Sequence, residues 1–170
     1  LAADPGFRDR RRTWHSVPER VDGTGSTAAS LADELVAGLE ASVAPLRARH
    51  EREMAELEAR NMRASEVNGR KGGRGGAKAG VAELEERQRR ELRRQRTDEL
   101  RAGLAVLAGA YRDRLTDPRR AEETLRALER VHATAVALQY NPGELLLLQG
   151  LLARLSQAAT GNGEAKSRSQ

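Results

Sequence analysis

The sequence predicts an all-α protein, and three observations lead to that prediction. Of its 170 residues, 32% are charged and only 2% are aromatic, a balance typical of long helices rather than of sheets. The stretch from Glu83 to Leu115 contains no proline and repeats its leucines at helical spacing. A glycine-rich segment at 68–80 separates this stretch from an earlier helical pattern. The predicted architecture is a small helical bundle with a long αα-hairpin extension and a disordered tail.

Composition also restricts the class of protein. The chain has no cysteine, which excludes disulfide frameworks, thiolate zinc sites and thiol catalysis. No apolar run approaches the roughly 20 residues that a transmembrane helix needs, so we expect a cytoplasmic protein without a membrane partner. The three histidines have no metal-ligand spacing, and no nucleotide-binding or catalytic motif occurs. We therefore expect no enzyme activity in this chain, no catalytic or metal-binding residue and no cofactor.

The N-terminal residues predict a short helix and a connector. Within 1–20, Asp4 fits the N-cap and Pro5 the first turn, while Pro18 should end the helix. Residues 21–29 contain Gly23, Gly25 and Ser26 and predict a flexible linker.

A second long helix is predicted over 30–67. Ser30 and Asp33 have the spacing of a capping box at its start, and Pro45 should kink the helix or divide it in two. The glycine density of 68–80 predicts a flexible loop at the tip of the hairpin. The helix carries a heptad-like seam that consists of Val36, Leu39, Val43, Leu46, His50, Glu53 and Leu57.

The helical stretches from 81 to 156 form the predicted bundle domain. Asp117 with Pro118, and Asn141 with Pro142, each mark the stop of one helix and the start of the next. Ahead of the first stop, one helix face carries the apolar residues Leu100, Leu104, Leu107 and Tyr111.

The last helix contains the run LLLLQGLLARL and predicts contact with another chain. Its leucines cover a wide arc of a helical wheel, with Leu146 outside that arc. Two neighbouring helices could hardly cover so wide an arc, so we expect a partner chain to bury the rest. Apolar periodicity ends at Gln157, and 157–170 should be disordered. The residues expected at subunit interfaces are Leu100, Leu104, Leu107, Tyr111, Leu145, Leu148, Leu152 and Leu155.

A net charge of +5 and a pI near 10.3 raise the question of nucleic-acid binding. Arginines and acidic residues nearly balance between Val81 and Arg101. Glu83 precedes Arg87 by one helical turn, the order that favours an ion pair. The pattern therefore indicates first a solvated helix that compensates its own charge. In the alternative interpretation, the residues that contact phosphates are Lys71, Arg87, Arg90 and Arg94.

The stretch from Leu84 to Leu115 resembles the C-terminal region of the delta-prime subunit of the bacterial DNA polymerase III clamp loader, in the version found in high-GC bacteria. In that family a Gly-rich loop precedes an Arg-rich helix that enters the sequence DELRxGLAxLAxxYRD, matched here by Asp98 to Asp113. Asn141 and Pro142, followed by LLLLQGLLARL, are similar to the family's closing helix. Residues 1–20, which begin LAADPGFRDRRR, are similar to the tail of its AAA+ lid domain.

The resemblance implies a collar domain. In this family the helical C-terminal domains of five subunits pack in a ring, with delta-prime beside a gamma or tau subunit and close to delta. The implied partners are therefore gamma or tau and delta, with DNA met only through the assembled, nucleoid-associated complex that loads the sliding clamp. The arginine finger of the family belongs to its AAA+ part, so no catalytic residue is carried over. The hairpin of 30–81 is an elaboration that the best-known collar domains lack.

Two other interpretations stay open. The chain could be a basic helical or coiled-coil protein that binds nucleic acid through its Arg-rich helix and Gly-rich loop, and its affinity should then fall steeply with salt. It could also be a free-standing antiparallel coiled-coil dimer that needs no other protein.

Overall fold

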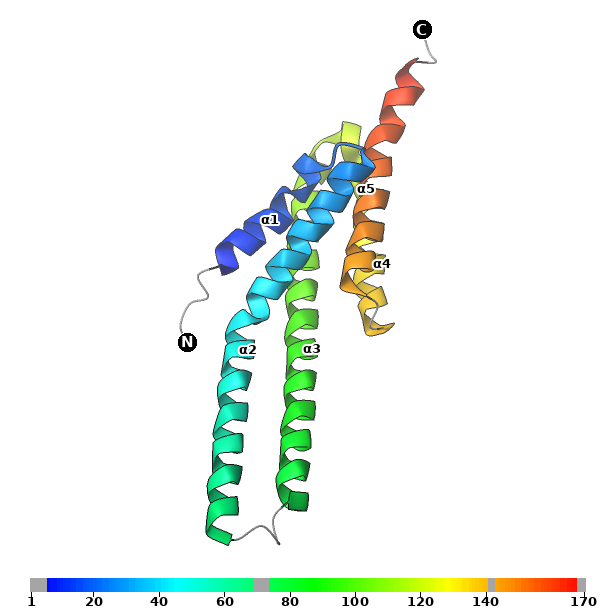
Figure 1. The fold of residues 1–170 in the computed structure, drawn as a ribbon. Helices are drawn as coiled ribbons and strands as arrows, with labels where there is room; N and C mark the ends of the chain where they lie inside the picture. The colour runs from blue at the N-terminus through cyan, green and yellow to red at the C-terminus, as the bar shows by residue number, and fades with distance from the viewer. Residues whose placement is uncertain (1–5, 69–73, 141–142, 168–170) are drawn as a thin grey trace. The chain divides into compact units, whose positions relative to one another are not determined.

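A computed structural model describes residues 6–68, 74–140 and 143–167, and throughout these ranges the ordered elements are helical (Figure 1). This confirms the all-α prediction. The helices are α1 (Phe7–Arg20), α2 (Gly25–Asn68), α3 (Arg74–Asp113), α4 (Ala121–Ala137) and α5 (Glu144–Ser167). Short 3-10 turns at Arg114–Thr116, Pro118–Arg120 and Leu138–Tyr140 flank α4.

The chain divides into two compact units, each described here by itself. The bundle unit comprises Leu1–Ala41 and Glu99–Gln170, and the hairpin unit comprises Ser42–Asp98. Both α2 and α3 contribute to both units. The sequence predicted a bundle domain of 81–156. The bundle unit also includes α1 and the first part of α2, whereas 81–98 belong to the hairpin unit.

The bundle unit has one apolar core to which all five helices contribute. On α3, Leu100, Leu104 and Leu107 are buried at the predicted helical spacing. Each buried leucine contributes on the order of 2 kcal/mol through removal of apolar surface from water. The core also contains Trp14 and Val17 of α1, Leu31, Leu35 and Leu39 of α2, Ala127 and Val131 of α4, and Leu148, Leu151, Leu152 and Leu155 of α5.

Helix α1 continues to Arg20, so the prediction that Pro18 ends it is wrong. Proline removes one backbone donor and disfavours helix in the residue before it. The helix closes within a turn of Pro18, with the amide of Val21 donating to the carbonyl of Val17 at 3.1 Å. The carbonyl of Pro18 accepts a hydrogen bond of 2.8 Å from Arg114. Asp4 and Pro5, predicted to start this helix, lie outside the described residues.

Helix α2 begins at Gly25, ahead of the predicted cap at Ser30, so the linker is shorter than 21–29. Turn chemistry at Asp22 and Thr24 explains the difference. The amide of Thr27 donates to Oγ1 of Thr24 at 3.3 Å, as a helix N-cap requires. The Asp22 carboxylate accepts the amide of Thr24 at 2.9 Å and the hydroxyl of Thr27 at 2.8 Å. These hydrogen bonds lower the pKa of Asp22.

The hairpin is formed by α2 and α3, which run side by side in opposite directions between 42 and 98 (Figure 1). Helix α2 passes through Pro45 without being divided. Helix α3 begins at Arg74, inside the predicted loop of 68–80, and 69–73 lie outside the described residues. Between the glycines of this stretch lie Ala77, Lys78 and Ala79, three consecutive residues that favour helix.

The last two helices of the bundle unit, α4 and α5, lie side by side (Figure 1). Asp117 acts as predicted, since its carboxylate accepts the amide of Arg119 at 3.0 Å and starts the turn that contains Pro118. The backbone of α5 is helical to Ser167, beyond Gln157, where the sequence predicts that order ends.

Candidate interaction surfaces

Seven of the eight residues expected at subunit interfaces lie in the core of the chain's own bundle unit. Leu148 and Leu152 have no exposed surface at all, because helices of the same chain cover them. The expectation that α5 needs a partner chain to cover its leucines is therefore corrected for most of its arc. The seven buried residues are Leu100, Leu104, Leu107 and Tyr111 of α3 and Leu148, Leu152 and Leu155 of α5.

The eighth residue, Leu145, is exposed and lies near the start of α5, just after the connection between α4 and α5. It is 40% exposed, and its neighbour Leu146 is 75% exposed. On the other side of the connection, Tyr140 is 78% exposed and Val136 one turn earlier is also exposed. We call these four residues the α4–α5 patch. Large apolar side chains gathered on a surface mark interaction sites more often than single ones do.

Helical-wheel geometry correctly placed Leu146 outside the buried arc of α5. Tyr140 and Val136 were not among the interface residues expected from the sequence. Their exposure depends on which face of α4 meets α5, and that is decided by packing between the helices.

The seam of the hairpin unit contains a polar layer. His50 and Gln88 are buried, and Nε2 of His50 lies 2.9 Å from a carboxylate oxygen of Glu91. The side-chain amide of Gln88 donates to the carbonyl of His50 at 3.1 Å and to Glu53 at 3.2 Å. Arg49 also pairs with Glu91. Hydrogen bonds from Arg49 and His50 lower the pKa of Glu91, and the one from Gln88 lowers that of Glu53.

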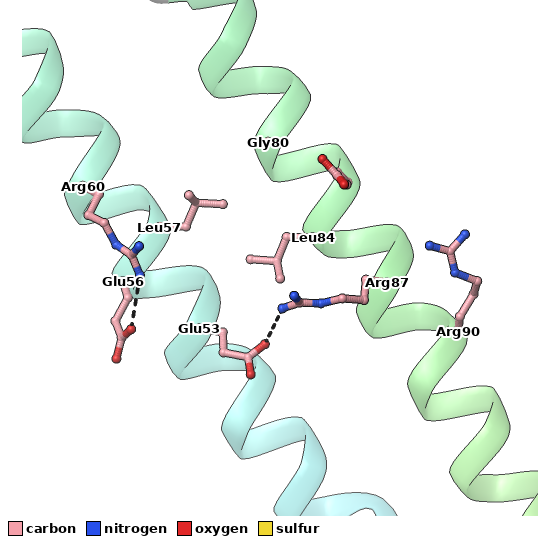
Figure 2. A pocket seen from close by; sticks show the side chains of 9 residues that line it. Glu53, Glu56, Leu57, Arg60, Gly80, Leu84, Arg87 and Arg90 are labelled. Atoms are coloured by element: carbon pink, nitrogen blue, oxygen red, sulfur yellow. Dashed lines mark hydrogen bonds and ion pairs between the residues drawn. The ribbon is translucent and has the colours of Figure 1, made fainter.

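Three of the four proposed phosphate contacts are paired with acidic side chains. Arg87 lies 3.2 Å from Glu53 of α2, as Figure 2 shows. Arg90 and Arg94 pair within α3, with Glu86 at 3.9 Å and Asp98 at 3.7 Å. The fourth, Lys71, lies outside the described residues. These exposed pairs add little stability, but a phosphate would have to compete with a carboxylate at each arginine.

Two grooves run between α2 and α3 in the hairpin unit. The first, seen in Figure 2, surrounds Leu57 and Leu84 with side chains of both signs, including the pairs of Glu53 with Arg87 and of Arg60 with Glu56. The second contains Met54 and Leu92 and is bordered by His50. We call them the charged groove and the methionine groove.

Across the described ranges, no cluster of His, Asp or Glu side chains is arranged to hold a metal ion. Among the same residues, no helix has the length and apolar character to cross a membrane. Comparison with protein-family models, curated proteins and solved structures gives no match to this chain.

Burial of Tyr111 predicts a loss of stability in alkaline solution. Desolvation raises its pKa from 10.0 to about 12. The unfolded chain therefore releases this proton before the folded chain does, and stability should fall as the pH rises from about 10 to 12, by roughly 2 kcal/mol. Urea denaturation followed by circular dichroism across this range measures the loss. Tyr111→Phe should show a smaller loss, whereas Tyr140→Phe, at an exposed site, should behave like the unmodified chain; equal curves for all three would contradict the prediction.

Proposed function

We propose that this chain is a non-catalytic assembly module, the collar part of a DNA polymerase III delta-prime subunit. It binds a neighbouring helical subunit of the clamp loader, gamma or tau, through the α4–α5 patch. The chain thereby helps to assemble the complex that loads the sliding clamp on primed DNA.

The observation that carries this proposal is the exposure of four large apolar side chains before and after the α4–α5 connection, in an otherwise well-packed helical unit. The bundle unit has its own core, so the patch is not needed for its folding. Tyr140, Leu145 and Leu146 would be costly to leave in water, and aromatic and aliphatic side chains of this kind anchor protein interfaces. The resemblance of Asp98 to Asp113 to the delta-prime sequence motif names the kind of partner.

Direct binding of nucleic acid is the weaker candidate. The arginines that it requires are paired with carboxylates of the same hairpin. A phosphate would have to break those pairs to bind, so each arginine would contribute less to the affinity for nucleic acid.

The proposal predicts that co-purification with gamma or tau depends on the patch. Combining Tyr140→Asp with Leu146→Asp should weaken binding by about 10-fold or more, since both replace anchor-type side chains by charges. Because both residues are exposed, the thermal denaturation curve should stay unchanged. Aspartates at Leu148 and Leu152 would test the core instead, since those residues are buried.

The matched control is Met62→Asp, which replaces an exposed apolar residue of the hairpin unit outside both grooves. It should leave binding unchanged. If the patch variant binds as tightly as the control, or if the unmodified chain binds neither gamma nor tau, the proposed function is wrong.

A further inference from the structure

The hairpin unit carries the whole net charge of the chain. It has 15 basic and 10 acidic residues, whereas the bundle unit has 15 of each. Even if every acid of the hairpin unit were paired with a base, the unit would keep a positive charge, and the bundle unit would keep none. Charge concentrated on one part of a protein attracts an oppositely charged partner to that part.

Part of this surplus lies on the side of α3 that faces away from α2. Glu91 and Gln88 point toward α2, where they contact His50. The exposed arginines between and beyond them occupy two adjacent rows at i, i+4 spacing on the opposite side, and Figure 2 shows Arg90 there. We call them the arginine face, which consists of Arg89, Arg90, Arg93 and Arg94.

Existing ion pairs do not neutralise the arginine face. One carboxylate, that of Glu86, serves two arginines, at 3.3 Å from Arg89 and 3.9 Å from Arg90. Asp98 lies 3.7 Å from Arg94. Among the residues that the structure describes, Arg93 has no hydrogen-bond or ion-pair partner. Four guanidinium groups therefore meet two carboxylates, and two positive charges remain with all these pairs intact.

The residues of the hairpin unit favour the phosphodiester backbone of nucleic acid as the ligand of this face. Guanidinium groups bind phosphate oxygens in a bidentate way. The unit contains no Phe, Tyr or Trp on which a base could stack. An anionic membrane surface would require apolar side chains beside the charges. The exposed large apolar residue of this unit, within its described ranges, is Met62 on the other helix.

We propose that the arginine face binds the backbone of duplex nucleic acid without regard to base sequence. As the function of the whole chain, nucleic-acid binding is the weaker candidate, because the arginines predicted for it are paired. The arginine face adds Arg93, which has no carboxylate partner in the described part of the chain, and Arg89, which shares one. This contact is additional to the proposed function and does not depend on it.

The test is the affinity of the full chain for a labelled DNA duplex, measured by fluorescence anisotropy at several salt concentrations. The logarithm of the affinity should fall with that of the salt concentration with a slope of about −3 to −4, as four contacted phosphates require. Duplexes of different sequence should bind equally. A chain that does not bind the duplex, or whose affinity does not respond to salt, overturns the proposal.

Removing charge from the arginine face should weaken binding. Combining Arg89→Gln with Arg93→Gln should lower the affinity about 10-fold and make the salt slope shallower by about 2. The matched control combines Arg112→Gln with Arg119→Gln, which removes two exposed arginines of the bundle unit and leaves the affinity unchanged. Circular dichroism establishes that both variants keep their helices. Equal losses of affinity in the two variants overturn the proposal.

An opposite change should strengthen binding. Glu86→Gln releases Arg89 and Arg90 from their shared carboxylate and should raise the affinity about 3-fold. Glu122→Gln is its control, because it changes the net charge equally and releases Arg126 in the bundle unit. It should have no effect. If Glu122→Gln strengthens binding as much as Glu86→Gln, the site is not on the arginine face.

Two further probes separate the class of ligand and the proposed function. Single-stranded DNA should bind more weakly than duplex, since its charge density is lower and the hairpin unit has no aromatic residue. Tighter binding of the single strand, or binding of anionic phospholipid vesicles in place of duplex, overturns the proposal. The variant with Arg89 and Arg93 changed should still co-purify with gamma or tau, so each proposal can fail without the other.

Discussion

Replacing Gly103 by alanine is expected to destabilise the chain by about 3 kcal/mol. Gly103 is a buried residue of α3 against which the indole of Trp14 packs, and a Cβ atom there would overlap that ring. The contact involves the rigid ring itself, so the clash requires Trp14, and α1 with it, to move. Alanine favours helix over glycine by only about 1 kcal/mol, which does not offset the lost packing.

Gly109→Ala is the matched control for this variant. It lies on the same helix, and an added Cβ atom would meet nothing within 4 Å. It should be neutral or stabilise the chain by about 1 kcal/mol or less. Urea denaturation followed by circular dichroism measures both. Trp14 is the sole tryptophan, so its fluorescence should shift to longer wavelength in Gly103→Ala alone. Equal stability of the two variants would mean that Trp14 does not pack on Gly103.

Replacing Glu99 by alanine is expected to cost about 4 kcal/mol. The Glu99 carboxylate receives Nε of Arg10 at 3.0 Å and a terminal nitrogen of Arg11 at 3.2 Å. The side chains of Glu99 and Arg10 are only 8% and 9% exposed, so removing the acid takes an ion-pair partner from a guanidinium that is largely out of water. Loss of one partner of a buried ion pair costs far more than the pair itself stabilises.

Glu34→Ala provides the comparison, because it removes the same type of side chain from an exposed pair. Arg20 and Glu34 lie 2.6 Å apart with 42% and 43% of their side chains exposed. Loss of this pair should cost less than about 1 kcal/mol. The two variants are compared by urea denaturation at neutral pH. Similar losses of unfolding free energy in both variants would contradict the prediction, because burial of Glu99 would then not increase the cost of removing it.

Helix positions and the apolar faces of long helices could be predicted from the sequence. The spacing of Leu100, Leu104, Leu107 and Tyr111 identified a buried face of α3, and Leu146 was correctly placed outside the buried arc of α5. These predictions succeed because helical periodicity is a local property, visible within a few turns.

What covers those faces could not be predicted. The partner of Glu99 is Arg10, which lies 89 positions away in the sequence, and nothing local marks either residue. The same holds for Gly103, whose role depends on Trp14. Because α1 and the start of α2 were assigned to other segments, the leucines of α5 seemed to need a second chain. Which residues remain exposed, as in the α4–α5 patch, follows only once all five helices are packed.

The polar layer of the hairpin has a consequence for how the two helices are aligned. A slip of α3 along α2 by one turn would separate His50 from Glu91 and Gln88 from Glu53, and would leave two buried polar side chains without their partners. Apolar layers would tolerate such a slip more easily, since one leucine can replace another. The seam thus encodes the alignment of the two helices through specific partners.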